Sequence, residues 1–372
     1  MNTNATGIIF SNMHDEELHE ITANRTMGSV PFGGRYRLID FTLSNLKNSG
    51  VTNVGVITKS NYQSLIDHLK SGKEWDLSRK RGGLFLFPPY GRHNSGFYRN
   101  KIEALFGIMT FIRKETNDYF LISDCDVICN MDWIRALNYH IEKHADITTI
   151  YYEKEPDPYP ENPETTYTVS EQGYVTDLMV GQKIKVKSKV GTNMWIIGRN
   201  LLITLIEDAI AHNYEDFERD IMQRKLNYLK IAAYKFEGYL RKINSITDFF
   251  QTNMDLLTPS VQKDLFHRYG KIYTKILDDI PTLYSSEASA INCLIANGCK
   301  IEGTVENSIL FRGVRVGKGA KISNSIIMQG SNIGEFATLN YVITDKDVTI
   351  NNQRILMGYE TNPVYIKKSS II

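Results

Sequence analysis

The sequence predicts an α/β domain with a largely parallel sheet, followed by a parallel β-helix. The chain has 372 residues, more than one hydrophobic core commonly organises, so we expect two domains. Up to about residue 235, apolar runs of strand length alternate with helical patterns, which is the order of βαβ units. From about residue 285, apolar residues recur every 17 positions instead. We assign residues 1–250 to the α/β domain, 251–284 to a linker and 285–372 to the β-helix.

The elements of the α/β domain follow from its apolar runs and helix ends. GIIF, from Gly7, is the first strand, and IDFTLSNLKNSG is an amphipathic helix that ends at Gly50. VTNVGVI is the next strand, and SLIDHLKSG is a helix that ends at Gly72. YFLISD and DITTIYYE are strands on either side of the helical MDWIRALNYHIEKH. The proline-rich segment 156–164 can extend neither kind of element, so we expect a surface loop there.

The carboxyl-terminal repeat has three apolar registers and small residues at fixed positions between them. A period near 18, divided into three short strands with turns between them, indicates a hexapeptide-type β-helix, whereas an ordinary β-sandwich has no such period. Each coil buries its apolar face only against its neighbours, so open ends and flat faces favour subunit contacts. The apolar registers are Val305, Ile322 and Leu339; Ile309, Ile326 and Ile343; and Val316, Ile333 and Ile350. The small residues are Gly313 and Gly330; Gly317 and Gly334; and Gly303, Ala320 and Ala337.

Composition argues against several classes of partner. Lys plus Arg (43) nearly equals Asp plus Glu (42), so charge gives no reason to expect nucleic acid or a membrane surface. The opening MNTNATG has no signal-peptide pattern, and no run of about 18 apolar residues occurs, so we expect a soluble, cytoplasmic protein. The cysteines Cys125, Cys129, Cys293 and Cys299 have no histidine nearby in the sequence, which favours reduced structural thiols over zinc or disulfides.

Two carboxylates follow the strand YFLISD. Asp124 and Asp126 are two residues apart, so in an extended chain they project to the same side. Such a pair at the carboxyl end of a strand is able to hold Mg²⁺ together with substrate phosphates. Equally, acids at this position cap the next helix or lie in solvated loops. The pair alone does not decide between these interpretations.

Three arginines surround a Pro-Phe-Gly-Gly turn in RTMGSVPFGGRYRLIDF. Arg25, Arg35 and Arg37 carry guanidinium groups, which bind phosphate oxygens in a planar, bidentate way. The cluster therefore indicates a site for a phosphorylated ligand. Surface ion pairing, such as Arg37 with Asp40, explains the same residues without a ligand.

Taken together, these motifs resemble bacterial glucose-1-phosphate adenylyltransferase, also called ADP-glucose pyrophosphorylase. The resemblance runs through PFGGRYRLIDFTLSNLKNSGVTNVGVIT, DVICNMDW, DFERDIM, EGYLRKINSITDFFQTNMDLL and the repeat domain, in that order. It implies a Rossmann-like nucleotidyltransferase domain of the GT-A type followed by a left-handed parallel β-helix. It also implies a reaction that makes ADP-glucose and pyrophosphate from ATP and glucose 1-phosphate with Mg²⁺, on the route to glycogen.

The phosphate-binding loop departs from that family's pattern. Active members carry a Gly-Gly-x-Gly-x-Arg-Leu run after the first strand, where this chain has FSNMHDEELHEIT. A glycine-rich turn lets backbone N–H groups approach a triphosphate, and an arginine neutralises it. In their place this chain has Asp15, Glu16, Glu17 and Glu20, which repel a triphosphate.

Other catalytic positions depart as well. The family's lysine in an Ala-Lys-Pro context aligns with Met27, and the small glycine of its Ser-Met-Gly strand aligns with Trp195. Its Glu-Glu-Lys-Pro stretch has no clear counterpart near MVGQKIKVKSK. Asp126 is retained, but the second metal-binding carboxylate aligns with Lys242, which replaces a negative charge by a positive one. We therefore expect the catalytic site and the metal site at Asp124 and Asp126 to be vestigial.

This pattern resembles the GlgD-type, non-catalytic branch of the family. The resemblance implies a regulatory subunit that forms a hetero-oligomer, of which a tetramer is expected, with a catalytic homologue that holds the Mg²⁺, while this chain holds no cofactor. It also implies a phosphorylated effector at Arg25, Arg35 and Arg37, joined by Arg354 or Lys367 from the β-helix.

Two other functions remain open at this stage. An active nucleotidyltransferase with altered specificity would bind its sugar phosphate through Lys59, Lys242 and Arg99. Hexapeptide β-helices also occur in acyltransferases, but no histidine follows His267 to act as the base in the repeat domain.

Overall fold

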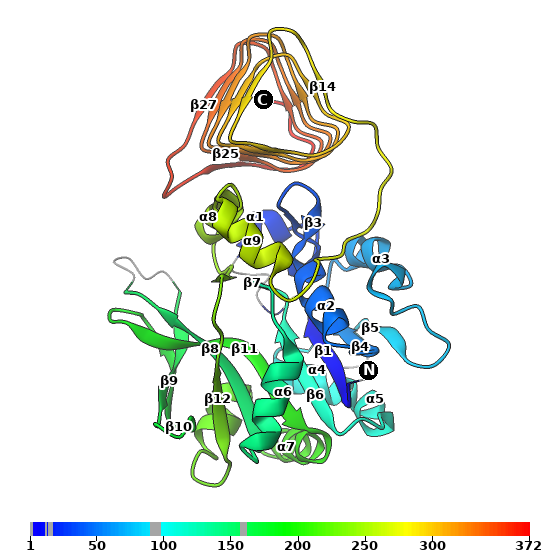
Figure 1. Ribbon diagram of the computed structural model, residues 1–372, viewed down its shortest axis with the longest axis vertical. Helices are drawn as coiled ribbons and strands as arrows, with labels where there is room; N and C mark the ends of the chain where they lie inside the picture. The colour runs from blue at the N-terminus through cyan, green and yellow to red at the C-terminus, as the bar shows by residue number, and fades with distance from the viewer. Residues whose placement is uncertain (1–2, 12, 14–17, 90–97, 157–161) are drawn as a thin grey trace.

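The computed structural model describes residues 3–11, 13, 18–89, 98–156 and 162–372. A twisted sheet with helices on both faces forms the amino-terminal part, and a three-sided prism of short strands forms the carboxyl-terminal part (Figure 1). Helices α8 (Ile246–Asp255) and α9 (Pro259–His267) lie between the two (Figure 1). The predicted order of an α/β domain and a β-helix is confirmed.

The sheet is parallel in one half and mixed in the other. Within the described residues it has nine strands, and β5-β4-β1-β6 are parallel neighbours, as the βαβ pattern predicts. Next to β6 lies β11, which is antiparallel to β6, β8 and β9. The second half departs from a parallel sheet because β9 and β10 follow each other through a short turn, which only antiparallel strands allow. The strands are β1 (Ala5–Phe10), β4 (Asn53–Ile57), β5 (Gly83–Phe87), β6 (Tyr119–Asp124), β8 (Ile147–Lys154), β9 (Glu164–Val169), β10 (Val175–Gln182), β11 (Ser188–Gly198) and β12 (Ile231–Lys235).

Two short strand pairs and several helices surround the main sheet. The strands β2 (Pro31–Phe32) and β3 (Tyr36–Arg37) form a hairpin, and β7 (Val127–Cys129) pairs with β13 (Leu240–Lys242). The predicted helices appear as α2, α3 and α6, and Asp132 caps α6 by accepting a hydrogen bond from the Ile134 N–H at 2.9 Å. The helices of this part are α1 (His19–Thr22), α2 (Leu38–Asn48), α3 (Gln63–Leu69), α4 (Lys101–Gly107), α5 (Met109–Lys114), α6 (Trp133–Glu142) and α7 (Arg199–Ala211), with the single turns η2 (Met27–Ser29) and η3 (Lys73–Trp75) and the π-helix η4 (Phe217–Gln223).

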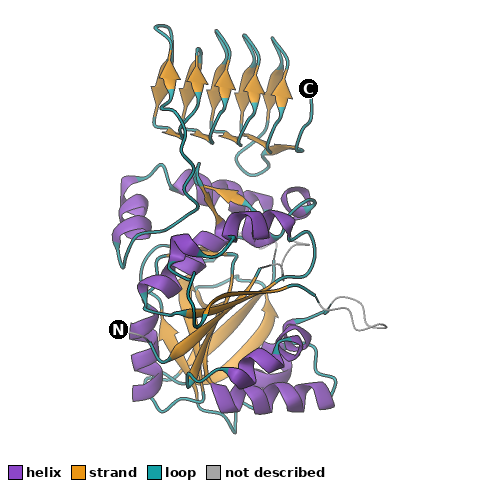
Figure 2. Cartoon of the chain, turned by 90° about the vertical axis from the view of Figure 1, so that its right-hand side faces the viewer, coloured by secondary structure: helices purple, strands orange, loops and turns teal. Residues whose placement is uncertain are grey.

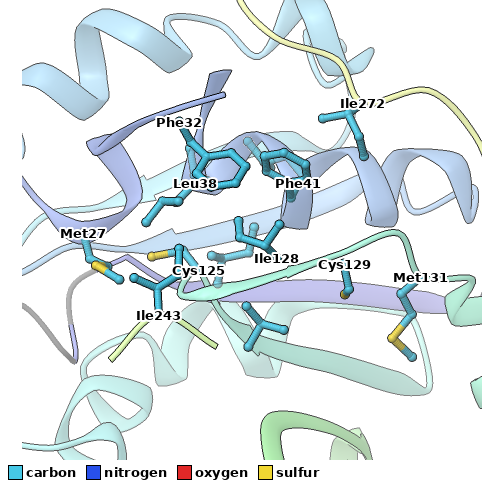
Figure 3. Packing of buried hydrophobic residues seen from close by; sticks show 14 of the residues in the cluster. Met27, Phe32, Leu38, Phe41, Cys125, Ile128, Cys129, Met131, Ile243 and Ile272 are labelled. Atoms are coloured by element: carbon cyan, nitrogen blue, oxygen red, sulfur yellow. The ribbon is translucent and has the colours of Figure 1, made fainter. Parts of the chain in front are cut away.

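Buried apolar residues tie the strands to the helices above them. In Figure 3, Phe32, Leu38 and Phe41 pack toward Ile128 and Cys125, which come from the region after β6. Cys125, Cys129 and Cys299 are buried free thiols, and Cys293 is a partly buried one, in agreement with the predicted reduced state. No described helix is both long and apolar enough to cross a membrane.

The β-helix follows the period read from the sequence. Three sheets of five parallel strands stack coil upon coil (Figure 2), and Val305 pairs with Ile322, which pairs with Leu339. A side chain at Gly317 would lie 2.9 Å from the Glu335 nitrogen, so this corner accepts only glycine. The strands are β14 (Leu283–Tyr284), β17 (Lys300–Ile301), β20 (Arg315–Val316), β23 (Asn332–Ile333) and β26 (Thr349–Ile350); β15 (Ser289–Ile291), β18 (Thr304–Glu306), β21 (Lys321–Ser323), β24 (Thr338–Asn340) and β27 (Ile355–Met357); and β16 (Leu294–Ile295), β19 (Ile309–Leu310), β22 (Ile326–Ile327), β25 (Val342–Thr344) and β28 (Val364–Ile366).

The segment 251–284, expected to be a linker, is largely part of the folded body. It contains the end of α8, all of α9 and the first strand of the β-helix. Leu256, Leu265 and Ile272 are buried in the same apolar cluster as Ile309 and Ile343 of the β-helix. The domains therefore share one hydrophobic core at their junction. Of the proline-rich segment, residues 157–161 lie outside the described residues, and residue 164 already begins β9.

Candidate functional site

The two carboxylates predicted after the strand YFLISD lie at the carboxyl end of β6, both about 1% exposed. The carboxyl edge of a parallel sheet is where α/β proteins commonly bind ligands. Here Asp124 already has a cation. The Lys101 Nζ, on the first residue of α4, lies 2.6 Å from the Asp124 Oδ2. Sequence reasoning missed this pair, because Lys101 stands in a helix apart from the motifs.

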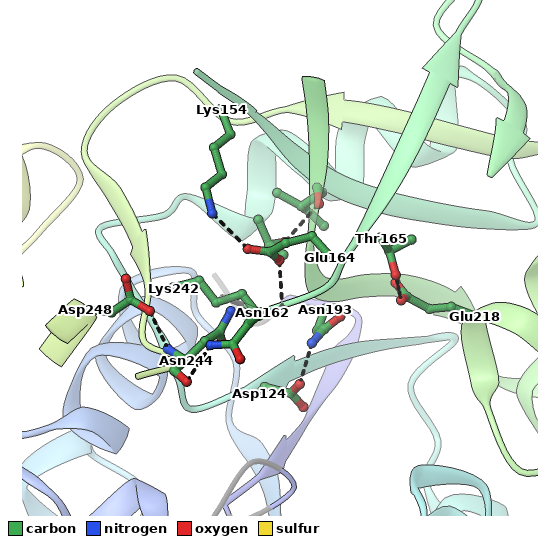
Figure 4. Close-up of polar contacts among 12 residues, drawn as sticks. Asp124, Lys154, Asn162, Glu164, Thr165, Asn193, Glu218, Lys242, Asn244 and Asp248 are labelled. Carbon is green, nitrogen blue, oxygen red and sulfur yellow. Dashed lines mark hydrogen bonds and ion pairs between the residues drawn. The ribbon is translucent and has the colours of Figure 1, made fainter. Parts of the chain in front are cut away.

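Asn193 also contacts Asp124, from the neighbouring strand β11. Its Nδ2 donates a hydrogen bond to the Asp124 Oδ2 at 3.0 Å (Figure 4). The pairing of β11 with β8 is irregular between Gly191 and Trp195, and Asn193 has a left-handed φ of 58° in this bulge. A β-bulge turns a side chain away from its regular direction, and here it turns the amide onto the carboxylate.

Lys242, where the sequence predicted a lost metal ligand, makes an interior ion pair. In Figure 4, Lys242 and Lys154 lie on either side of Glu164. The Lys242 Nζ is 3.3 Å from the Glu164 Oε2, and the Lys154 Nζ is 3.1 Å from the other oxygen. Burial lowers the pKa of the Lys242 ammonium, but the nearby carboxylates of Glu164 and Asp126 more than reverse this, so its pKa is raised. Lys242 therefore stays charged at neutral pH.

Aromatic and hydroxyl side chains line the site beside Lys101 and Glu218. Trp195 is about 1% exposed and stacks on Phe217 with ring centroids 4.6 Å apart. The Lys101 Nζ lies 4.9 Å from the Trp195 ring centroid, within the range of a cation–π contact. Tyr167 donates a hydrogen bond to the Glu218 carboxyl at 3.1 Å, and burial raises the pKa of that carboxyl.

These residues do not fit a divalent metal ion. Magnesium needs carboxylate oxygens about 2 Å away, and ammonium groups stand beside Asp124 and Glu164 instead. Across the described ranges, no group of three or more His, Cys, Asp and Glu residues is arranged to hold a metal. The vestigial metal site at Asp124 and Asp126 stays a prediction that the geometry supports.

The acidic loop is only partly covered by the structure. Asp15, Glu16 and Glu17 lie outside the described residues, while Glu20 is exposed at the start of α1. Met27 is buried in the turn η2 and packs in the core (Figure 3). It therefore offers no charge to a ligand.

The arginine cluster lies where the α/β domain meets the β-helix. Arg25 is 3% exposed, and its Nη2 lies 2.8 Å from both carboxylate oxygens of Asp345. Tyr365 donates a hydrogen bond to the same carboxylate at 2.9 Å. Within the described residues, the Arg25 Nη1 is buried without a hydrogen-bond partner. The arginine is thus held by the β-helix rather than by a surface carboxylate.

A second layer of positive charge surrounds this pair. Burial lowers the pKa of Lys346 to about 8, and the charges of Arg37 and Arg25 contribute, as does Lys368. Burial likewise lowers the pKa of Arg37 to about 10. Burial is the largest cause of both shifts, and the carboxylates of Asp40 and Asp67 oppose it in part at Arg37.

The cluster differs in part from the sequence expectation. The Arg37 guanidinium donates to Ser64 at 2.5 Å rather than pairing with Asp40, whose carboxylate takes the Arg37 backbone N–H and His68. Arg35 lies 5.4 Å over the Tyr36 ring. Arg354 and Lys367 are exposed on the β-helix.

The β-helix contributes Asp345 and Lys346 to this junction, and sequence reasoning missed both. Their signal was present, because the charged run Asp345–Asp347 begins at the repeat position where Phe311 and Met328 are buried apolar residues.

Comparison with known proteins agrees with this architecture. The family described as "Nucleotidyl transferase" matches residues 7–180, and the family described as "GlmU-like, C-terminal hexapeptide" matches residues 281–362. The chain is 33% identical over 370 residues to the "Glycogen biosynthesis protein GlgD" of Bacillus subtilis, covering 100% of this chain and 97% of that protein. It is 37% identical over 324 residues to the protein of the same name from Geobacillus stearothermophilus, with 87% and 84% covered. It is 36% identical over 313 residues to a "Glucose-1-phosphate adenylyltransferase" of the latter organism, with 82% and 79% covered.

Proposed function

Because the chain belongs to the family of glucose-1-phosphate adenylyltransferases and GlgD proteins, we propose that it is a regulatory, catalytically deficient subunit of ADP-glucose pyrophosphorylase. In this proposal it acts in the cytoplasm in glycogen biosynthesis and assembles with a catalytic homologue into a hetero-oligomer, with a tetramer as the expected form. The Mg²⁺ and the conversion of ATP and glucose 1-phosphate to ADP-glucose belong to that partner.

One observation carries the proposal. The carboxyl edge of β6 is filled by the chain's own charges, with Lys101 on Asp124 and Lys242 on Glu164. Transfer of the adenylyl group of ATP to a sugar phosphate, with pyrophosphate leaving, needs cations aimed at the phosphates, and these two are aimed at protein carboxylates. A subunit without turnover still regulates a partner when it favours one of the partner's conformations, for which a coupling free energy of about 1 to 3 kcal/mol is enough.

The assay for this role compares the chain alone with the chain plus a catalytic homologue. We expect no ADP-glucose from ATP, Mg²⁺ and glucose 1-phosphate with the purified chain. We expect the mixture to differ from the homologue alone in kcat, in KM or in its response to effectors. Robust turnover by the isolated chain rejects the proposal, and so does a mixture that behaves as the homologue does by itself.

The junction at Arg25 is the proposed effector site. Arg37 and Lys346 bring positive charge to the junction, and burial lowers the pKa of each, which suits an anionic, phosphate-bearing effector. Because Arg25 already holds Asp345, replacing Arg25 would disturb the fold as well as the site. Lys346→Gln is the sharper variant, with Lys321→Gln on the exposed face of β21 as its control. Unchanged activation of the mixed complex by sugar phosphates in Lys346→Gln would remove the junction from consideration.

An active enzyme with altered specificity is the second candidate. It is favoured by the 36% identity to an adenylyltransferase, which nearly equals the 37% identity to a GlgD protein. Its expected residues do not act together, because Arg99 pairs with Glu103 on the surface while Lys242 pairs with Glu164 in the interior. Calorimetric titration with ATP and Mg²⁺ separates the two candidates, since tight, metal-dependent nucleotide binding supports only the active enzyme.

A further inference from the structure

Four carboxyl groups lie together, each less than a tenth exposed, near the carboxyl end of β6: Asp124, Asp126, Glu164 and Glu218. Buried carboxylates require a compensating cation. We propose that Lys101 and Lys242 are tethered cations that take the place of a divalent metal ion here, so that this edge binds neither Mg²⁺ nor Mn²⁺ until they are removed. The inference deepens the proposed lack of turnover and rests on it.

Lys101 occupies the position where a metal would bind Asp124. Its Nζ is 2.6 Å from the Asp124 Oδ2, whereas Mg²⁺ requires about 2.0 to 2.1 Å to its oxygen ligands, so both cannot use this oxygen. Rings lie around the same ammonium, with centroids 4.9 Å away at Trp195 and 5.6 Å away at Phe10. Aromatic faces suit an ammonium group but supply no oxygen ligand to a hard cation.

Asn193 completes the selection against a metal at Asp124. It presents an N–H group to the Oδ2, and a donor cannot ligate a cation. Its left-handed φ of 58° is a conformation in which asparagine is tolerated better than most residues. The bulge therefore holds a donor, rather than an acceptor, against the carboxylate.

Lys242 pairs its ammonium group with the buried carboxylate of Glu164, as Lys101 does with Asp124. The β13–β7 pairing places Lys242 opposite Val127, next to Asp126, and its ammonium reaches the Glu164 Oε2 at 3.3 Å. Lys154 takes the other oxygen at 3.1 Å, so Glu164 is bracketed by two positive charges. A divalent cation at this place would add two further positive charges beside them.

The test measures divalent-cation binding by the full-length chain, without any turnover assay. Mn²⁺ serves as the probe, read by electron paramagnetic resonance and by the shift of Tm. The variants are Lys101→Met, Lys242→Asp and the double variant. The control is Lys225→Met, because Lys225 pairs with Asp208 at a similar 2.7 Å but in a partly exposed position with no other carboxylate of the cluster.

We expect the wild-type chain and the control to show no bound Mn²⁺ and no Mn²⁺-dependent rise of Tm. The double variant is expected to have a lower Tm, to bind Mn²⁺ and to regain part of its Tm when Mn²⁺ is added. Mn²⁺ bound at this edge in the wild-type chain overturns the inference, and so does a folded double variant that binds none. If the double variant does not fold, the same criteria apply to Lys242→Asp alone. If the metal-exclusion inference is overturned, the regulatory role is still tested by the activity assay with the partner. The inference and the proposed function can therefore fail independently.

Discussion

The strand edge at Asp124 and the domain junction at Arg25 are both built from buried charges, yet their charge balance differs. At the strand edge, ammonium groups of the chain itself lie on Asp124 and Glu164. At the junction, Arg25 pairs with Asp345, and burial together with the charges of Arg37 and Arg25 lowers the pKa of Lys346 to about 8. At the strand edge, cations of the chain itself balance Asp124 and Glu164, whereas at the junction Lys346 is a buried cation with a lowered pKa.

This contrast suggests how a family fold changes its role. A buried ion pair contributes little net stability, but removing one partner leaves an uncompensated charge in the interior. A buried carboxylate that pairs with a lysine, as Asp124 does with Lys101, is therefore part of the structural core. Buried positive charge without a matching anion destabilises the fold until an anion binds, so the stability of such a region depends on ligand binding.

The largest expected effect is the loss of Lys101. Lys101→Met removes the ammonium that lies on the buried Asp124 carboxylate, and we expect the free energy of unfolding to fall by about 3 kcal/mol. Urea unfolding of the full chain measures it. Lys225→Met, at a partly exposed pair, should cost less than about 1 kcal/mol. Equal losses in the two variants would mean that the Lys101–Asp124 pair stabilises the fold no more than a partly exposed ion pair does.

The next effect concerns the junction. Arg25→Met leaves the Asp345 carboxylate with Tyr365 and the Lys346 backbone N–H, and we expect a loss of about 2 kcal/mol in unfolding free energy. The double variant Arg25→Met with Asp345→Asn should recover most of this loss, because it removes both charges. A double variant as unstable as the single one would show that shape, not charge, is what Arg25 supplies.

The third effect is on anion binding and depends on pH. Lys346, with a pKa of about 8, carries its charge below pH 8 and loses it above. Inorganic phosphate or a sugar phosphate should therefore bind more tightly at pH 7 than at pH 9, and binding should take up protons. Lys346→Gln should weaken binding at pH 7 by about tenfold, the size expected for one charged hydrogen bond. Calorimetry in buffers of different ionisation enthalpy measures the affinity and the protons, and a pH-independent affinity would contradict the assignment.

The lowered pKa of Lys346 also makes the unfolding free energy of the anion-free chain depend on pH. The unfolded chain holds a proton on this lysine up to about pH 10.4, whereas the folded chain releases it near pH 8. The lysine therefore makes the fold less stable below pH 8, and this penalty disappears as the pH rises from 8 to about 10. In Lys346→Gln this rise should be absent from urea unfolding curves taken across that range.

The repeat registers show which parts of the molecule a sequence can specify. Val305, Ile322 and Leu339 pair as the period predicts, because each coil repeats the same local environment. Lys101 was not foreseen, since its partner Asp124 lies 23 residues away and only the packing of α4 against β6 brings the two together. Arg25 was foreseen as a phosphate ligand, but Asp345, 320 residues later, holds it. Charge pairs between distant elements leave no periodic trace in the sequence.

The smallest effect tests why Asn193 stands in the bulge at the strand edge. Asn193→Gly loses the hydrogen bond to Asp124 but accepts the φ of 58° freely, whereas Asn193→Ala loses the same bond and keeps the strain. We expect the alanine variant to be less stable than the glycine variant by about 1 kcal/mol in urea unfolding. If the glycine variant equals the wild-type chain, backbone conformation alone selects asparagine. If both variants are destabilised equally, the hydrogen bond from the amide to Asp124 is the dominant reason for asparagine at this position. Asn193 would then belong to the network of side-chain contacts at the strand edge.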